Sequence, residues 1–338
     1  MNDVFQRIEA AIRRDPGRRG LLGEVGGPLG LGELETAAKS LAAPGTHAVI
    51  VTGFFIPLAE PAAAETDGPP GAVALAETLR RLSRSATLVT DPFCGPAVRA
   101  AAAAADLPDS IVRVLQEPSE LAALLERSSP RATHLIAIER VGPGYTDDVL
   151  RSRCGAEAAL QFAECVPREL WSRCLNMRGV PIEEWTVDFS AVFEAPPAGV
   201  TTIGLGDGGN ELGLGKFSWC DLRGRLDAVA DPRILCRVAA DHAIVAGTSN
   251  WAAYGLAAAT AFAAEQPEAF AGITSERQQH VLERMVRDGP AVDGVSRRFE
   301  PTVDGLPLLT YFEPLEAIHR RLRKCEHEFA DSSQANDS

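Results

Sequence analysis

Short apolar runs alternate along this chain with alanine- and leucine-rich segments that have helical spacing. The apolar runs cover residues 47–53, 86–90, 111–115, 133–138, 201–205 and 243–246. The helical segments cover residues 71–82, 98–105, 120–127 and 251–264. Continuous apolar strands that alternate with helices are typical of a parallel sheet. We therefore predict an α/β fold with a largely parallel or mixed central sheet and helices on both faces.

The spacing of these elements predicts a single large domain. Two breaks are visible, at residues 59–70, which are rich in Pro and Ala, and at residues 143–148, which are rich in Gly and Asp. A helical pattern follows each break, so we interpret both as loops over a site and not as linkers between domains. The domain is predicted to span residues 1–329, and the polar segment 330–338 is predicted to be disordered.

Composition narrows the range of expected partners. The 338 residues carry a formal net charge of −13, and 46% of them are hydrophobic. Nucleic acid and anionic membranes bind basic faces, so a small molecule is the better candidate partner, and a homo-oligomer stays open. Thr248, Ser249 and Asn250 interrupt the longest uncharged run, and residues 1–20 contain no apolar leader. We therefore expect a cytoplasmic protein without a membrane span.

The segment 201–216, TTIGLGDGGNELGLGK, carries the most informative chemistry. It leads from an apolar strand into a glycine loop, whose backbone can turn sharply and present N–H groups to a ligand. Asp207, Asn210 and Glu211 add oxygen ligands of the kind that suit Mg²⁺, Mn²⁺ or Ca²⁺. Open α/β sheets bind ligands at such strand ends. The alternative is a tight glycine turn in which Asp207 caps a following helix.

A second polar cluster, ETDGPPG at residues 65–71, precedes one of the predicted helices. Prolines at the entry fix φ and preorganise the first helical turn. The N-terminus of that helix would then point its free N–H groups towards the same region as the carboxylates. Asp67 is therefore a candidate metal ligand, and a simple helix cap is the equal alternative.

Polar side chains also follow three other predicted strands: Asp91, Glu139 and the pair Ser249 and Asn250. In a parallel sheet these residues emerge at one edge, together with Asp207. Carboxylates that converge repel one another unless a cation or a proton lies between them, so the pattern favours a divalent metal site. Each acid on its own has a structural alternative, as a cap or a salt-bridge partner.

Several common catalytic patterns do not occur in this sequence. It contains no GxSxG, Walker A or HExxH pattern, and GLGDGG lacks the spacing and the downstream acid of a dinucleotide-binding fold. His242 is the histidine nearest to the motifs above. A lone histidine beside an apolar strand is more often structural than a ligand, so we do not place it in the site.

Six motifs in the same order suggest a family. They are DPGRRGL at residues 15–21, TGFFIP followed by ETDGPPGA, the strand end IER, NMRG at 176–179, GDGGNELGLG, and AGTSNW at 246–251. From about Asp15 to about Leu322 the chain resembles the D-glutamate cyclase family, in its carboxyl-terminal catalytic-type domain, which also occurs alone in bacteria and archaea. The combination of ETDGPPG with GDGGNE is specific.

The resemblance implies interconversion of D-glutamate and 5-oxo-D-proline with loss or gain of water, assisted by Mn²⁺ or Mg²⁺. Implied metal ligands are Asp67, Asp207 and Glu211, with Asp91 as a further choice, and implied catalytic residues are Asp207, Glu211 and Glu139. Arg178, Lys216 and the N–H groups of Gly208 and Gly209 would hold a substrate carboxylate. The remaining implied substrate-binding residues are Asn176, Asn210 and Asn250.

One segment departs from the pattern of the family. Many relatives have a close Asp-Gly and an aromatic residue between IER and NMRG, whereas here residues 147–175 intervene and read as a helical insertion. This insertion would cover the site or change which substrate fits, and Asp147 or Asp148 would be the replacement for the missing Asp.

Two other functions remain open. GDGGNE also resembles the Mg²⁺ loop of haloacid dehalogenase phosphatases, which makes a metal-dependent phosphatase or hydrolase of a small anionic substrate the alternative. Against it, the first strand leads into Thr52-Gly53-Phe54 and not into a DxD nucleophile. A non-catalytic sensor of an amino acid or a metal is less favoured, because a carboxylate binder would use cationic and neutral donors.

Overall fold

All six predicted apolar runs form one parallel sheet in the computed structural model, which describes residues 2–23, 27–226 and 232–336. The strands are β1 (His47–Thr52), β4 (Ser85–Thr90), β5 (Val112–Val114), β6 (His134–Ile138), β7 (Thr201–Gly206) and β8 (His242–Val245). Their order is β5-β4-β1-β6-β7-β8, and every neighbouring pair is parallel. The α/β prediction is confirmed. All six strands end at the same edge, which we call the carboxyl edge, and begin at the amino edge.

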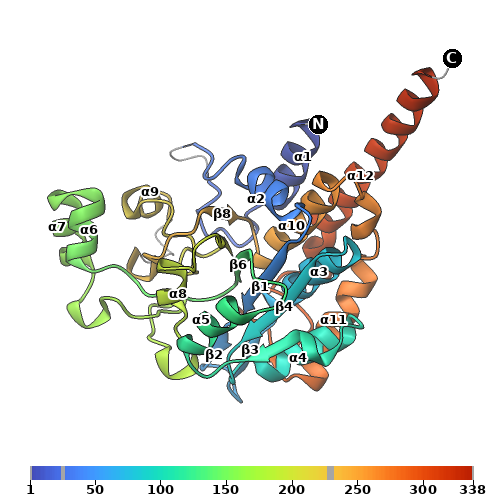
Figure 1. Cartoon of the computed structure of the whole chain (residues 1–338). Coiled ribbons are helices and arrows are strands. Elements are labelled where there is room, and N and C mark those ends of the chain that lie inside the picture. Colours follow the sequence, from blue (N-terminus) through green and yellow to red (C-terminus); the bar gives the residue numbers. More distant parts are fainter. Residues whose placement is uncertain (1, 24–26, 227–231, 337–338) are drawn as a thin grey trace.

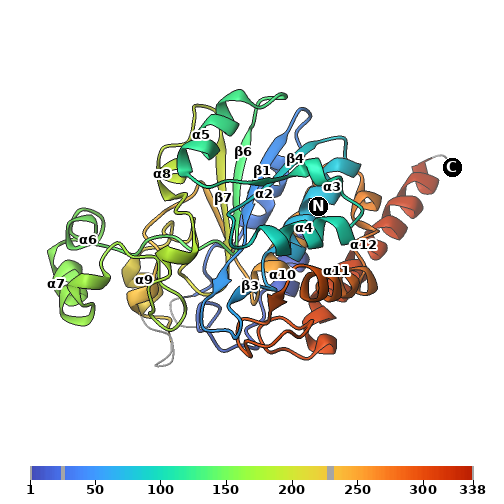
Figure 2. The same ribbon diagram turned by 90° about the horizontal axis from the view of Figure 1, so that it is seen from below.

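Helices cover both faces of the sheet, as predicted (Figure 2). Side chains alternate along β1, so Ala48 and Ile50 pack in the larger core with α3 and α10, while Val49 and Val51 pack against α5 and α8. The helices are α1 (Asn2–Ile12), α2 (Glu33–Leu41), α3 (Pro69–Arg81), α4 (Gly95–Ala104), α5 (Pro118–Arg127), α6 (Asp147–Cys154), α7 (Ala156–Cys165), α8 (Ser190–Glu194), α9 (Trp219–Arg223), α10 (Ser249–Ala263), α11 (Ser275–Asp288) and α12 (Leu308–Asn336).

Helices α3 and α10 pack closely and both begin at the carboxyl edge. A Cβ atom on Gly71 would lie 2.7 Å from the Cβ of Ala253, so only glycine permits this approach. Prolines start α3, and the Thr248 side chain caps α10 by accepting a hydrogen bond from the N–H of Trp251 at 3.1 Å. Two helix N-termini therefore lie beside the strand ends that carry the predicted acids.

A small second sheet was not predicted from the sequence. It contains β2 (Phe55–Ile56), β3 (Ala63–Glu65) and β9 (Ala291–Val292), in the order β2-β3-β9. Strands of two or three residues are too short to show a hydrophobic period, which explains the omission. The pairing of β3 with β9 brings the loop after β9 next to the ETDGPPG segment.

The predicted insertion 147–175 is helical and lies to one side of the sheet. Helices α6 and α7 stand apart from the sheet next to α9 (Figure 1). The Phe162 ring packs edge-on against Trp219, with their centroids 5.7 Å apart. Aromatic packing of this kind attaches the segment to α9.

The last helix extends into the polar segment at the end of the chain. Helix α12 continues to Asn336, and residues 337–338 lie outside the described part of the chain, so disorder of the segment 330–338 stays a prediction. Extending an existing helix by one residue needs no new nucleation, so a polar sequence can continue a helix that packed residues have started.

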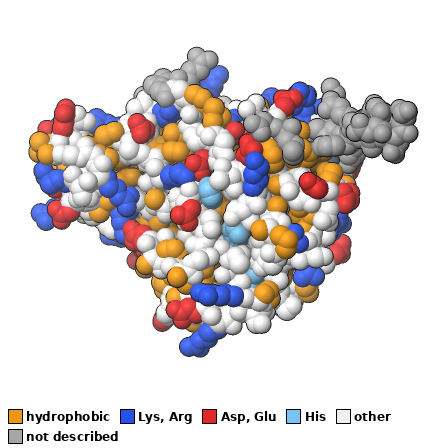
Figure 3. Space-filling view, turned by 45° about the horizontal axis from the view of Figure 1, so that its top comes forward, with side chains coloured by type: hydrophobic (Ala, Val, Ile, Leu, Met, Phe, Trp, Pro, Cys, Tyr) orange, Lys and Arg blue, Asp and Glu red, His pale blue; other side chains and the backbone are white. Residues whose placement is uncertain are grey.

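The surface carries charges of both signs. On the face in Figure 3, Lys and Arg side chains lie among Asp and Glu side chains and do not gather in one basic patch. Among the described residues, no helix has both the length and the apolar character needed to cross a membrane.

Candidate active site

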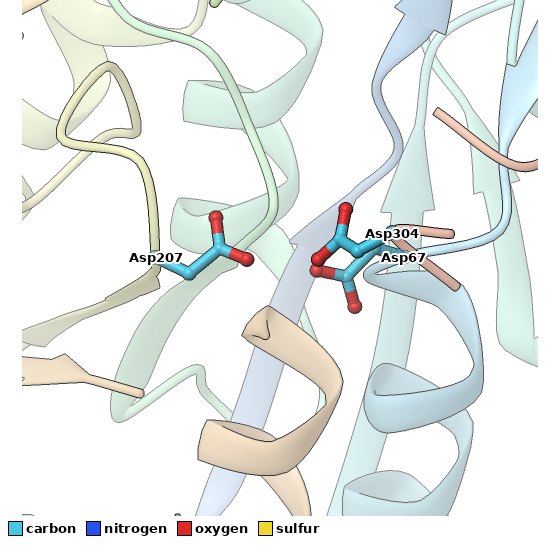
Figure 4. A group of neighbouring side chains, drawn as sticks. All are labelled: Asp67, Asp207 and Asp304. Carbon is cyan, nitrogen blue, oxygen red and sulfur yellow. The ribbon is translucent and has the colours of Figure 1, made fainter. Parts of the chain in front are cut away.

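Five carboxylates from four separate segments meet near the carboxyl edge. Their oxygen atoms form two groups, Asp67 with Asp207 and Asp304, and Asp207 with Glu139 and Glu211, within which all ligand atoms lie within 4.8 Å of one another. Figure 4 shows Asp67 and Asp304 side by side, with Asp207 facing them from the loop after β7. We call these five residues the acid cluster.

Asp67 lies at the N-terminus of α10. Its carboxylate accepts hydrogen bonds from the backbone N–H groups of Ser249, at 2.8 Å, and Asn250, at 2.9 Å. Burial and the charge of Asp304 nevertheless raise the pKa of Asp67 to about 7, against these N–H groups and Arg19, which lower it. Asp67 therefore changes its protonation state near neutral pH.

Glu139 follows β6 in a left-handed backbone conformation, with φ of 46°. A non-glycine residue with this φ is uncommon and often lies at a functional site. The Ser249 hydroxyl donates a hydrogen bond of 2.6 Å to the Glu139 carboxylate. Burial raises the pKa of Glu139 well above its usual range, and the charges of Glu211 and Asp67 raise it further. The Glu139 carboxyl therefore keeps its proton to a higher pH than an exposed glutamate does.

Arg19 is the cation that faces the acid cluster. Its guanidinium forms ion pairs with Asp207 and with Asp304, and the Asp304 contact measures 2.7 Å. Burial raises the pKa values of both aspartates, while Arg19 lowers them. Arg19 alone does not balance the five carboxyl groups, so their crowding favours either protonation or the binding of a further cation.

The Glu211 side chain holds the backbone of the glycine loop by hydrogen bonds. Its carboxylate accepts hydrogen bonds from the N–H groups of Asp207 at 2.9 Å, Gly208 at 2.7 Å and Gly209 at 2.7 Å. The N–H groups that the sequence assigned to a substrate carboxylate are thus directed at Glu211. Asn210 is also engaged, because its amide donates to the Leu175 carbonyl at 2.9 Å.

A cavity of about 180 Å³ opens above the acid cluster. Such a volume suits a small metabolite better than a drug-sized ligand, which occupies roughly 300 Å³ or more. The lining residues are Arg19, Phe54, Ile56, Leu58, Glu65, Glu139, Asn176, Met177, Arg178, Gly294, Val295, Arg297 and Asp304. Glu139 and Asp304 belong both to this lining and to the acid cluster, so a molecule in the cavity reaches the carboxylates directly.

The acid cluster also fits a divalent cation. All its donors are carboxylate oxygens, which Mg²⁺ and Mn²⁺ prefer. Within the described part of the chain, the buried Oδ2 atoms of Asp207 and Asp304 have no hydrogen-bond partner. Unpaired buried oxygens are costly, and a cation between them would remove that cost.

Comparison with known proteins shows the family of the chain. Residues 8–157 and 166–319 match the family described as D-glutamate cyclase-like, C-terminal. The chain belongs to this family. It is also similar to the human protein named D-glutamate cyclase, mitochondrial, with 31% identity over 273 residues, which cover 75% of this chain and 38% of the human protein. The chain thus spans well under half of that relative.

The family match leaves out only a short part of the segment predicted as an insertion. Residues 158–165, which lie in α7, are not matched, whereas residues on either side of them are. The departure from this cyclase-like family is therefore concentrated in α7, away from the cavity lining.

Three predicted residues of the cyclase-like site have other partners in the structure. Asp91 follows β4, but it forms a buried ion pair of 2.6 Å with Arg140 and is not in the acid cluster. Asn250 accepts hydrogen bonds from the N–H groups of Gly68, at 3.0 Å, and Gly71, at 2.8 Å, and so braces the start of α3. Asn176 lines the cavity, yet its side-chain oxygen accepts from the N–H of Arg178 at 2.9 Å.

Lys216 is not at the site. Its ammonium group pairs with Glu33 at 2.8 Å and also binds the carbonyl of Asp241, the residue before β8. This contact lies at the amino edge, because the glycine loop runs back along the sheet: Gly213 packs on Gly204, within β7. His242 pairs with the same Glu33, at 3.2 Å, which agrees with a structural role.

Four charged cavity residues were missed by the sequence reasoning: Arg19, Glu65, Arg297 and Asp304. Arg19 and Glu65 lie inside two of the motifs that carry the family resemblance, DPGRRGL and ETDGPPGA. Asp304 precedes Gly305 in an ordinary turn signal, and nothing local distinguishes Arg297 from its neighbour Arg298. Only the fold brings these residues to the cavity.

Proposed function

We propose that this protein is a lyase that interconverts D-glutamate and 5-oxo-D-proline with loss or gain of water. The observation that carries the proposal is a small cavity with an acid cluster at its base and arginine side chains in its wall. Arginine suits the carboxylates of an acidic amino acid, and protonated carboxyls suit the removal of an oxygen as water. The name of the human relative supports the choice of substrate.

The chemistry requires two proton transfers. In ring closure at neutral pH the ammonium nitrogen loses two protons and attacks the side-chain carboxyl carbon, a C–N bond forms and a C–O bond breaks. The departing carboxylate oxygen gains two protons and leaves as water. Glu139 lines the cavity with a raised pKa, and it gives a proton to the departing oxygen. Asp207 takes a proton from the nitrogen when it is in its charged form, which Arg19 favours and burial opposes. Arg178 binds the other carboxylate of the substrate.

We further propose Mn²⁺ or Mg²⁺ as a cofactor, held by Asp67, Asp207 and Asp304. When bound, such a cation supplies Lewis acidity to the reacting carboxyl group and offsets the charge of the cluster. The carboxylate-only donor set and the unpaired Oδ2 atoms support this choice.

The test is a chiral assay of the purified, metal-stripped protein with D- and L-glutamate and both 5-oxoprolines. Each substrate is incubated with EDTA, Mg²⁺ or Mn²⁺. We expect metal-dependent interconversion restricted to the D series. Absence of turnover in both directions under all conditions would contradict the proposal, and release of phosphate from simple esters with Mn²⁺ would favour the phosphatase alternative instead.

A further inference from the structure

Two arginines in the cavity wall lack partners. Arg178 and Arg297 come from segments far apart in the sequence, and both line the cavity. In the described part of the chain neither guanidinium has a hydrogen bond or an ion pair, whereas Arg19 is paired with Asp207 and Asp304. The wall therefore presents two guanidinium groups to a ligand, and each group can bind one carboxylate through two hydrogen bonds.

The loop that carries Arg297 is built around one buried residue. The Asp293 carboxylate accepts hydrogen bonds from the N–H groups of Val295, Ser296 and Gly305 and from the Thr302 hydroxyl, at 2.7–3.0 Å. These bonds close the loop between residues 293 and 305. A loop fixed in this way holds its side chains in place before a ligand arrives, which lowers the entropic cost of binding.

The same loop contains two non-glycine residues in left-handed backbone conformations. Arg297 has φ of 59° and Asp304 has φ of 56°. Each conformation costs stability and persists only where the surrounding structure imposes it, often at a ligand site. Arg297 and Asp304 both line the cavity, so the loop delivers one cation and one member of the acid cluster to the same space.

We propose that Arg297 and Arg178 form a two-point clamp for substrates with two carboxylates. Arg297 shares its loop with Asp304, so it binds the reacting carboxylate next to the acid cluster. Arg178, on the Asn176 turn, binds the second carboxylate. That the substrate of the clamp is glutamate rests on the proposed function. That the substrate carries two carboxylates rests on the two arginines alone.

The clamp distinguishes the two sides of the reaction. Open-chain glutamate has two carboxylates at neutral pH, whereas 5-oxoproline has one, because its side-chain carboxyl has become a lactam. Arg297 therefore contributes to binding of the open chain and much less to binding of the ring. Arg178 contributes to both.

The experiment measures binding of two probes to the purified full chain by titration calorimetry in EDTA, where we expect no turnover of 5-oxo-D-proline. Glutarate presents two carboxylates with no amine, and 5-oxo-D-proline presents one carboxylate. Arg297→Gln is compared with Arg298→Gln, a matched control whose side chain is 74% exposed, does not line the cavity and approaches Glu300. We expect Arg297→Gln to lower the affinity for glutarate by roughly ten- to 100-fold, because the charge-assisted hydrogen bonds of the guanidinium are lost. The affinity for 5-oxo-D-proline should change by less than about threefold.

Three further readouts make the result specific. Arg178→Gln should lower the affinity for both probes. Arg297→Lys should retain part of the affinity for glutarate, because lysine keeps the positive charge. Urea midpoints of all variants show whether the fold is intact. Equal glutarate affinities in Arg297→Gln and Arg298→Gln, or no glutarate binding by the unmodified protein, would overturn the clamp.

The clamp and the proposed function fail in different ways. If the unmodified protein does not interconvert D-glutamate and 5-oxo-D-proline, but its glutarate affinity depends on Arg297, the reaction is wrong and the clamp stands. If turnover occurs and Arg297→Gln leaves glutarate binding unchanged, the reaction stands and the clamp is wrong.

Discussion

The two edges of the central sheet differ in how their charged side chains are paired. At the amino edge two acids have close partners: Glu33 pairs with Lys216 and His242, and Asp241 accepts hydrogen bonds from the N–H and hydroxyl of Thr202. At the carboxyl edge the five members of the acid cluster face Arg19, and several of their pKa values are raised. Charge is balanced at one edge and in excess at the other.

This difference indicates where the sequence has been shaped by stability and where by function. Paired charges need no further explanation, since their partners offset the cost of removing them from water. Crowded, buried carboxylates reduce stability, so their presence requires a benefit outside folding. A cation, a proton or a substrate carboxyl group that reaches the carboxyl edge would provide it.

Substitution of Asp207 should have the largest effect on activity. Asp207→Asn keeps the shape of the side chain and removes its charge, so we expect kcat/KM for D-glutamate to fall by about 100-fold or more. The matched control is Asp241→Asn, the corresponding change at the amino edge, which should lower the urea midpoint and leave turnover nearly unchanged. Full activity in Asp207→Asn would remove this residue from the mechanism.

Loss of Arg19 should have the largest effect on stability. Arg19→Gln leaves Asp207 and Asp304 without their cation, and breaking a buried ion pair costs about 3–5 kcal/mol. Urea denaturation in EDTA at about pH 8 measures this loss, and Arg18→Gln, an exposed neighbour, is the control with an expected loss below about 0.5 kcal/mol. Added Mn²⁺ should recover part of the loss if the cluster binds the cation. Equal losses in the two variants would mean that Arg19 does not balance the cluster.

Stability should fall as pH rises. The folded pKa of Asp67 is about 7, above the value of about 4 of an unfolded carboxyl, so the folded protein binds more protons than the unfolded chain between these values. The free energy of unfolding then decreases through this window, by at most about 1.4 kcal/mol per pH unit for one group. Urea titrations in EDTA from about pH 5 to pH 8 should show the decrease, and Asp67→Asn should reduce the slope. A stability that is constant or rises over this range in the unmodified protein would contradict the assigned direction.

The sheet and half of the site were predictable from local sequence. Apolar runs fix β1, β4, β5, β6, β7 and β8, and the residues just after parallel strands lie at one edge of the sheet, so Glu139 and Asp207 were found from their positions alone. Asp67 was found because prolines mark the helix entry beside it.

The other half of the site depends on contacts between distant segments. Arg19 and Asp304 are 285 positions apart, and no local period relates them. The short strands β3 and β9 bring the Asp304 loop to the cluster, and they are too brief to be seen in the sequence. For Lys216 the error has the opposite cause: it was assigned by proximity to the glycine loop, but the chain turns back along β7 before it reaches Lys216.

Lys216 therefore provides the smallest and most direct test of the comparison between edges. Lys216→Gln removes an exposed pair with Glu33, so the free energy of unfolding should fall by less than about 1 kcal/mol, because solvent screens such pairs. We expect kcat/KM for D-glutamate to change by less than about twofold, whereas Arg178→Gln, from the cavity wall, should raise KM. If Lys216→Gln raised KM as much as Arg178→Gln, the amino edge would contribute to substrate binding, and the separation of a balanced edge from a functional edge would be wrong.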